Sequence, residues 1–295
     1  MATKSAAAGN VKETLEKEVD WLKVLTPSGS FAARKSGKLR SLLTLDANAT
    51  PGFAGEEADA RAASDVLRQE LFELQGRLYA QAQQQLLLVL QAMDTGGKDG
   101  VIRKVFSGVN PMGVRVARFE RPTPAELAHD YLWRVHPQVP AKGDIVIFNR
   151  SHYEDVLVVR TNNLVPKSRW SKRYRHIREF ERLVHDEGTQ IVKIYLHIDK
   201  DEQAQRLQAR LDDPARNWKY DENDLAQRKL WDDYMKAYED AIEQTDRSHA
   251  RWHIVPANHK WYRDFAVLNI LVQTLRQMKP RYPRAVIDPS TQKIV

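Results

Sequence analysis

A glycine pair followed at once by a lysine, Gly96-Gly97-Lys98, stands between an apolar run and a segment with helical spacing. Glycines let backbone N–H groups turn toward an anion, a helix N-terminus adds positive potential, and a lysine adds a point charge. The apolar run, residues 86–90, has the length and continuous character of a strand buried on both faces of a parallel sheet. We therefore predict a phosphate-binding loop that includes Gly96, Gly97, Lys98, Asp99, Gly100, Arg103 and Lys104.

This loop departs from the usual Walker A spacing, in which a glycine and four further residues precede Gly-Lys-Ser/Thr. Ala92 stands in place of the first glycine, and Asp99 stands in place of the metal-binding hydroxyl. A carboxylate beside a polyphosphate is costly unless a cation lies between them, so we interpret Asp94 as a magnesium-side residue. A tight strand-to-helix turn that binds nothing is the alternative.

A second polar cluster, residues 149–155, follows another apolar run at 145–148. Ligands of parallel α/β sheets bind at the carboxyl ends of the strands, so we expect this cluster to lie opposite Lys98. Arg150 carries a planar fork suited to bidentate phosphate binding. A helix N-cap without a ligand is the alternative. The predicted nucleotide or acceptor side consists of Asn149, Arg150, Glu154 and Asp155.

The basic residues are concentrated in two further segments. The chain has a net charge of +7, and residues 160–182 hold eight Lys or Arg against two Glu. This imbalance favours an anion track with Arg173, Arg175 and Arg178, although a solvated helix face is the usual explanation of such a run. The second segment resembles a closing lid, which would bring positive charge over a transferring phosphoryl group. The alternative is an ordinary surface helix whose basic residues pair with Asp and Glu. The predicted lid residues are Arg206, Arg210 and Lys219.

Strands alternate with helices along the chain, which predicts a parallel sheet covered by helices on both faces. The expected strands are 86–90, 114–119, 145–148, 191–198 and 252–255. The expected helices are 11–25, 60–81, 101–106, 124–135, 170–187, 200–211, 224–244 and 260–277. We predict an N-terminal extension at 1–64, a phosphate-loop domain at 65–285 with a lid around 200–225, and a tail at 286–295.

Composition excludes several kinds of site. The 295 residues include no cysteine, which excludes disulfides, thiolate zinc sites and cysteine nucleophiles. No apolar run approaches the roughly 20 residues of a membrane span, and the N-terminal residues do not resemble a signal peptide. We expect a soluble cytoplasmic protein, with no membrane partner, that forms a homo-oligomer, either a dimer or a tetramer.

Several motifs in order along the chain resemble the family-2 polyphosphate kinases. The likeness extends over roughly residues 65–280, and the motifs that carry it are 91–100, 147–156, 174–177, 207–214, 231–234 and 255–264. The resemblance implies an α/β, three-layer αβα phosphate-loop kinase fold with a mainly parallel five-stranded sheet, an arginine-bearing lid and an N-terminal extension. It also implies phosphoryl transfer between inorganic polyphosphate and nucleotides with Mg²⁺, or with Mn²⁺ as a substitute.

The resemblance assigns roles residue by residue. Asp94 and Lys98 would be essential to transfer together with Arg150. The commonest family pattern has Asp where this chain has Asn149 and Asn where it has Glu154. This variant is similar to the branch that phosphorylates both AMP and ADP, and it moves metal ligation towards Asp94 and Glu154.

The sequence thus predicts a polyphosphate-dependent nucleotide kinase that converts AMP to ADP and ADP to ATP in a reversible, Mg²⁺-dependent reaction. A nucleotide phosphate is already an oxyanion at neutral pH, so the protein has only to align and neutralise two polyanions. One alternative is an ATP-dependent nucleotide or small-molecule kinase with the same loop. Another is a basic nucleic-acid-binding protein, which we rank low because no RNA- or DNA-binding motif is present.

Overall fold

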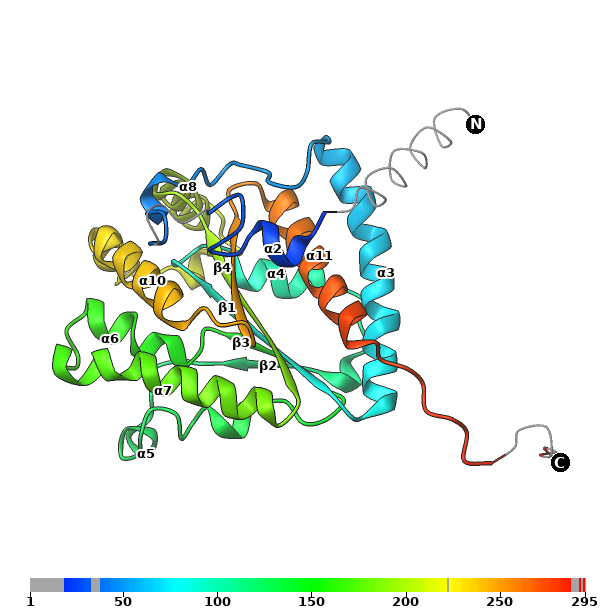
Figure 1. Ribbon diagram of the computed structural model, residues 1–295. Helices are drawn as coiled ribbons and strands as arrows, with labels where there is room; N and C mark the ends of the chain where they lie inside the picture. Colours follow the sequence, from blue (N-terminus) through cyan, green and yellow to red (C-terminus); the bar gives the residue numbers. More distant parts are fainter. Residues whose placement is uncertain (1–18, 33–37, 222, 288–291, 293, 295) are drawn as a thin grey trace.

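The protein is built around a five-stranded parallel sheet, shown in the computed structural model of Figure 1. The structure describes residues 19–32, 38–221, 223–287, 292 and 294. The strand order is β2-β3-β1-β4-β5, and every neighbouring pair is parallel. The strands are β1 (Gln85–Ala92), β2 (Val114–Arg118), β3 (Ile145–Asn149), β4 (Thr189–His197) and β5 (Ala250–Pro256). All eight residues of β1 are buried, because this central strand has neighbours on both sides and helices on both faces.

Helices cover the two faces of the sheet and give the predicted three layers. On one face α3 (Glu57–Gln81) packs against α11 (Lys260–Met278), which also contacts α4 (Lys98–Val105). On the other face α7 (Lys167–Asp186) packs against α10 (Trp231–Thr245). The predicted α/β fold with a mainly parallel five-stranded sheet is therefore confirmed.

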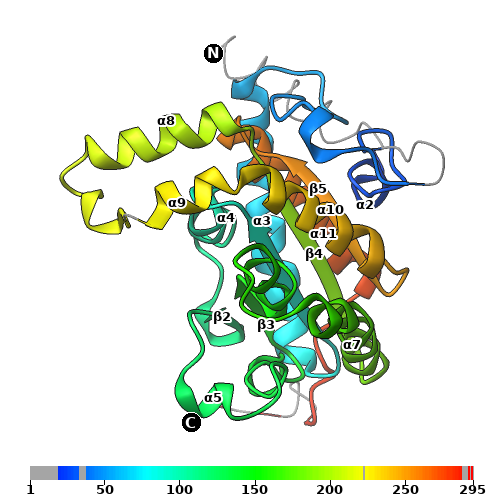
Figure 2. The same cartoon turned by 90° about the vertical axis from the view of Figure 1, so that its left-hand side faces the viewer.

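Two further helices extend from the body as an arm. Figure 2 shows α8 (Lys200–Leu211) and α9 (Asn223–Lys229) projecting together from one side of the molecule. The short helix η5 (Asn217–Lys219) lies on the connection between them. This arm occupies the segment in which the sequence predicts a lid. The other short helices are α2 (Trp21–Val24), α5 (Pro124–Leu127), α6 (Val158–Thr161), η1 (Leu42–Thr44), η2 (Pro111–Gly113), η3 (His136–Gln138) and η4 (His152–Asp155).

The described part of the N-terminal segment is hydrogen-bonded to β5 and to α11. The N–H of Ile254 donates to the carbonyl of Leu25 at 2.7 Å, and the hydroxyl of Tyr262 donates to the carbonyl of Pro51, also at 2.7 Å. The first contact pairs a backbone N–H on the outer edge of β5, where the strand has no neighbour among the described residues, and the second joins the segment to α11. The predicted division at residues 64 and 285 stays a prediction, and residues 11–18 of the predicted first helix lie outside the described part.

Two predicted helices are wrong in extent. The helix predicted at 124–135 ends at Leu127, because the Asp130 carboxylate accepts the N–H of Leu132 at 2.9 Å and forms a local turn in competition with the helix. The single helix predicted at 224–244 is divided into α9 and α10. Leu230 has ψ 19° and begins the turn from the arm into the core layer. No helix in the described residues is both long and apolar enough to span a membrane.

Candidate functional site

The predicted phosphate loop lies between the end of β1 and the start of α4. Gly97 precedes the first helical residue and has φ 105°, a conformation that a side chain would make costly. The Nζ atom of Lys98 donates to the carbonyl of Ala92 at 2.8 Å, so the lysine folds back across the loop. Burial lowers the pKa of Lys98, and the nearby charge of Asp94 opposes that shift. The loop therefore holds a partly desolvated cation next to the N-terminus of α4, where backbone N–H groups and the helix dipole also favour an anion.

The second polar cluster lies beside this loop because β3 pairs directly with β1. Asn149 is in register with Leu90, and a guanidinium N–H of Arg150 donates to the Asp94 carboxylate at 3.1 Å. Arg150 has φ 63°, an uncommon left-handed conformation for a residue with a side chain. Such conformations persist where the surrounding structure enforces them and are frequent at functional sites. The structure thus brings Arg150 and Asp94 together with Lys98.

Asn149 contacts the residue that replaces the Walker A hydroxyl. Its side-chain amide donates to the Asp99 carboxylate at 2.8 Å. Burial acts to raise the pKa of Asp99, but the hydrogen bond from Asn149 and the charge of Lys219 outweigh it, so this pKa is lowered. Asn149 therefore fixes an ionised Asp99 at the start of α4, where a carboxylate is also favoured by the helix dipole.

Two carboxylates are available to a divalent cation at this edge of the sheet. Glu154 follows β3, and burial raises its pKa against the positive charges of Arg150 and Lys98, while the charge of Asp94 adds to the rise. Mg²⁺ keeps several waters and is held by one or two carboxylates with substrate phosphates, so Asp94 and Glu154 fit this ion. Among the described residues no group of three or more His, Cys, Asp or Glu forms a complete protein cage for a metal.

The predicted lid residues contact the loop region in the structure. The guanidinium of Arg206 donates to the carbonyl of Thr95 at 3.1 Å and to the carbonyl of Ala257 at 2.6 Å. Lys219 lies 3.7 Å from the Asp99 carboxylate. These contacts join the arm to the phosphate loop. Arg210 is paired with Asp224 of α9 at 3.1 Å, which joins the two sides of the arm.

The other predicted binding residues lie in different surroundings. Arg173 donates to the Asp155 carboxylate at 2.8 Å, and only 11% of either side chain is exposed. Burial raises the pKa of Asp155 to about 6, against the charge of Arg173. Arg175 is exposed and lies 3.7 Å from Glu179, and Arg178 donates to a backbone carbonyl. The roles predicted for these residues stay predictions.

Arg103 and Lys104 lie in the last turn of α4, at the end away from the loop glycines. The structure therefore does not bring these two residues to the turn that contains Lys98. Their contact with phosphate stays a prediction, and it would require a polyphosphate long enough to run along α4.

A buried hydrogen-bond network around Lys193 restrains the backbone of the second polar cluster. Lys193 is fully buried in β4, and its ammonium donates to Glu181 at 2.7 Å, to the hydroxyl of Tyr153 at 2.9 Å and to the carbonyl of Thr245 at 2.9 Å. The Tyr153 hydroxyl also donates to Glu181 at 2.7 Å. Because Tyr153 directly precedes Glu154, this network restrains the chain that carries the second carboxylate.

Sequence reasoning missed two residues near the loop. Asp224 of the arm pairs with Arg210 at 3.1 Å, and burial, followed by the charge of Asp94, raises its pKa. Arg263 of α11 is 3% exposed and lies against the loop glycines. Arg263 lies within the motif at 255–264 that carries the family resemblance, whereas nothing in the local pattern distinguished Asp224 from its acidic neighbours.

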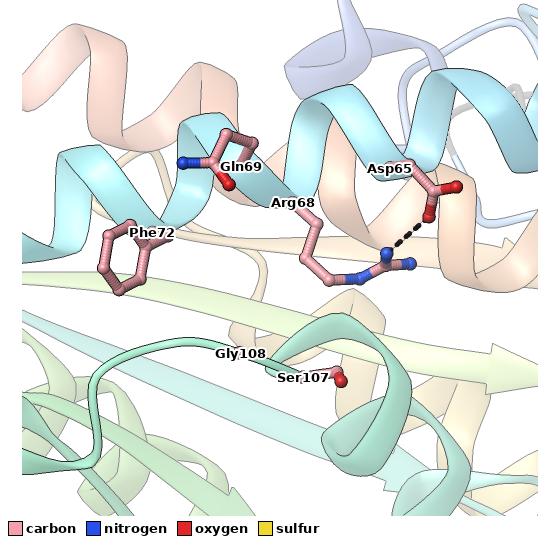
Figure 3. Close-up of a pocket in the computed structure, with 6 residues that line it drawn as sticks. All are labelled: Asp65, Arg68, Gln69, Phe72, Ser107 and Gly108. Carbon is pink, nitrogen blue, oxygen red and sulfur yellow. Dashed lines mark hydrogen bonds and ion pairs between the residues drawn. The ribbon is translucent and has the colours of Figure 1, made fainter.

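Figure 3 shows a pocket of about 250 Å³ elsewhere on the surface. It lies between α3 and the segment after α4, and contains none of the predicted site residues. Its lining residues are Asp65, Arg68, Gln69, Phe72, Ser107 and Gly108. The pocket is thus separate from the candidate site, which is the cluster at the strand ends around Lys98.

A parallel α/β sheet with a phosphate loop at its central strand and a basic arm above that loop defines the chain as a phosphate-loop protein of the kinase type. The sequence model of the family described as Polyphosphate kinase 2 (PPK2) matches residues 55–283. The chain therefore belongs to the polyphosphate kinase 2 family, and the family predicted from the sequence motifs is confirmed.

Several polyphosphate phosphotransferases are similar to this protein over most of its length. The AMP/ADP-polyphosphate phosphotransferase of Meiothermus ruber is 57% identical over 269 residues, which are 91% of this chain and 97% of that protein. The ADP-polyphosphate phosphotransferase of Rhodopseudomonas palustris is 45% identical over 227 residues, 73% of this chain and 78% of that protein. The crystal structure of polyphosphate kinase 2 from Arthrobacter aurescens superposes with a TM-score of 0.86 at 42% identity, covering 92% of this chain and 94% of that one.

Proposed function

We propose that the protein transfers the terminal phosphoryl group of inorganic polyphosphate to AMP and to ADP, forming ADP and ATP. The observation that carries this proposal is the contact between Arg150 and Asp94, which joins two strand ends around Lys98. A relative that is 57% identical over nearly its full length, and is named for both acceptors, supports the same reaction.

The transfer makes and breaks one phosphorus–oxygen bond. An oxygen of the terminal nucleotide phosphate attacks the terminal phosphorus of polyphosphate, and the bond to the next phosphate breaks. The electron pair of that bond remains on the oxygen of the shortened polyphosphate. No general base is required, because the attacking oxygen already carries a negative charge. Because a phosphoanhydride is both broken and formed, the reaction is reversible.

The residues of the site align and neutralise the two anions. Lys98 and Arg150 bind phosphate oxygens from two neighbouring strand ends, and this fixes the in-line geometry that phosphoryl transfer needs. When bound, Mg²⁺ is held by Asp94 and Glu154 and neutralises charge on the phosphates, and Mn²⁺ with its similar preference for oxygen ligands substitutes for it.

The arm limits the competing reaction with water. Its contacts through Arg206 to the loop and through Lys219 to Asp99 hold it over the phosphate site. A closed arm excludes water from a phosphoryl group that would otherwise be hydrolysed. We propose the exposed basic residues of α7 as the track for the remainder of the polyphosphate. The predictions of a homo-oligomer and of a cytoplasmic location accompany this proposal.

An incubation with AMP, Mg²⁺ and long-chain polyphosphate, with no ATP added, tests the proposal. Nucleotides are separated by chromatography over time, and ADP followed by ATP is the expected result. Formation of ADP alone would contradict the second acceptor. No product from AMP or ADP with a folded protein would refute the donor and favour an ATP-dependent kinase, and retention on DNA without any transfer would favour a nucleic-acid-binding protein.

A further inference from the structure

Arg263 is a buried charge beside the phosphate loop to which the proposed transfer assigns no role. It is the fourth residue of α11 and is 3% exposed. Its Nε and Nη2 atoms donate to the Asp264 carboxylate at 2.8 and 2.7 Å. A buried guanidinium is costly unless it is paired, and this pairing satisfies one side of the fork. The other side of the fork faces the loop.

The absence of side chains at Gly97 and Gly100 leaves room for the guanidinium group of Arg263. If Gly97 carried a Cβ atom, that atom would collide with Nη1 of Arg263, and Nη1 of Arg206 would lie 3.6 Å away. A Cβ atom on Gly100 would lie 3.1 Å from Nη2 of Arg263. Two guanidinium groups from two different helices, α8 and α11, therefore approach the backbone of the turn that precedes Lys98.

The loop needs such support from outside. Thr95 has φ 62° and Gly97 has φ 105°, so the turn contains two left-handed residues within three positions. The conformation of Thr95 is costly for a residue with a side chain, and the surrounding structure must enforce it. Arg206 donates to the carbonyl of Thr95 at 3.1 Å. Arg263 fills the space next to Gly97 and Gly100, on the same face of Gly97 that Arg206 approaches.

We propose that Arg263 is a positioning residue for phosphoryl transfer: its guanidinium, held by Asp264, supports the turn from Gly97 to Gly100 and so fixes Lys98 for the transition state. Arg263 does not touch the transferred group in this account. Displacement of a catalytic group by about 1 Å lowers the rate by about 100-fold, so a loose loop acts mainly on kcat. Arg206 is the partner of Arg263 in this support.

The test compares Arg263→Met with Arg276→Met in the assay with polyphosphate and AMP. Arg276 is a matched control, because it lies on the same helix and also pairs with a carboxylate, Glu70 at 2.6 Å, but it lies near the other end of that helix. We expect Arg263→Met to lower kcat by about 10- to 100-fold with the KM for AMP within about threefold. Arg276→Met is expected to keep the parent kcat.

Arg263→Lys gives a second readout. A lysine keeps the charge but has a single ammonium group, which cannot support the turn and hold Asp264 in fork geometry together. We expect a kcat between those of the parent and Arg263→Met. A folded Arg263→Met protein, verified by circular dichroism and cooperative thermal unfolding, with the parent kcat would overturn the proposal.

If Arg263→Met does not fold, Gly100→Ala decides the question. Alanine is a better helix former than glycine, so this change alone favours the fold of α4. The added Cβ atom, 3.1 Å from Nη2, displaces the guanidinium slightly. We expect lower kcat without loss of thermal stability, and no further loss when Gly100→Ala is combined with Arg263→Lys. A parent kcat for Gly100→Ala, or fully additive losses in the double variant, would contradict the proposal.

This inference rests on the proposed transfer from polyphosphate, but different results would refute the transfer and the role of Arg263. An inactive parent protein would refute the transfer itself. An active parent whose Arg263 variants are equally active would refute only the role of Arg263.

Discussion

The contact between Asn149 and Asp99 leads to a prediction for Asn149→Asp. This change is nearly isosteric, but it replaces an amide donor, 2.8 Å from the Asp99 carboxylate, with a second carboxylate. Two unit charges at that distance repel by about 1.5 kcal/mol in water and about 6 kcal/mol at an effective dielectric constant of 20. Asn149 is buried, but 60% of the Asp99 side chain is exposed, so water screens the pair and a value near the lower one is expected. Loss of the hydrogen bond adds about 1 kcal/mol.

The expected cost in the free energy of unfolding is therefore about 2–3 kcal/mol in the absence of divalent cations. For a chain of this size, this corresponds to a fall of about 5 °C in the unfolding temperature. A pair of carboxylates at hydrogen-bond distance also attracts a divalent cation, because such a cation replaces the repulsion with two attractive contacts. Millimolar Mg²⁺ should therefore restore most of the stability lost by Asn149→Asp.

Thermal unfolding in excess EDTA and in millimolar Mg²⁺ checks both parts. Asn149→Ala is the control: it also removes the hydrogen bond, so it should lose about 1 kcal/mol, but it should gain no more from Mg²⁺ than the parent protein does. The reasoning would be refuted if Asn149→Asp were as stable as the parent in EDTA. It would also be refuted if Mg²⁺ stabilised all three proteins equally.

Three other predictions concern the site and the core. Lys98→Ala and Asp94→Ala should each lower kcat by about 10³-fold while the protein still unfolds cooperatively, because both side chains act on charge at the reacting phosphates; initial rates near those of the parent would contradict this. Lys193→Met should destabilise the fold by about 3–5 kcal/mol in urea unfolding, because it leaves Glu181 buried without its cation; the double variant with Glu181→Leu should recover part of that loss, and no recovery would contradict the pairing. Burial lowers the pKa of His253 to about 4, so the unfolded chain binds this proton more tightly and stability falls as the pH drops from 6.5 towards 4. Between pH 7.5 and 5 this residue should account for about 2 kcal/mol of lost stability, and His253→Gln should lose that much less than the parent in urea titrations at the two pH values.

The layers of the fold were predictable because each strand is a continuous apolar run. Residues 86–90 and 145–148 have no polar interruption, and both lie in buried strands of the sheet. Helix ends were less predictable, because competing side-chain contacts decide them. The hydrogen bond from Leu132 to Asp130 ends a helical pattern that the apolar spacing alone continues.

The site was predictable where a residue follows a strand directly. Asn149, Arg150 and the loop around Lys98 lie at neighbouring strand ends, so their meeting follows from the parallel topology. Contacts between distant segments were not predictable in this way. The pair of Arg173 with Asp155 and the approach of Arg263 to Gly97 depend on how helices pack, which sequence spacing does not determine.

The most direct measurement of the central claim uses polyphosphate labelled with ³²P and unlabelled AMP, with Mg²⁺ present and ATP absent. The account predicts that the label appears first in the β-phosphate of ADP and then in the γ-phosphate of ATP, as the labelled polyphosphate shortens. Unlabelled ADP, or label that stays in polyphosphate or appears only as free phosphate, would contradict transfer from polyphosphate to the nucleotide.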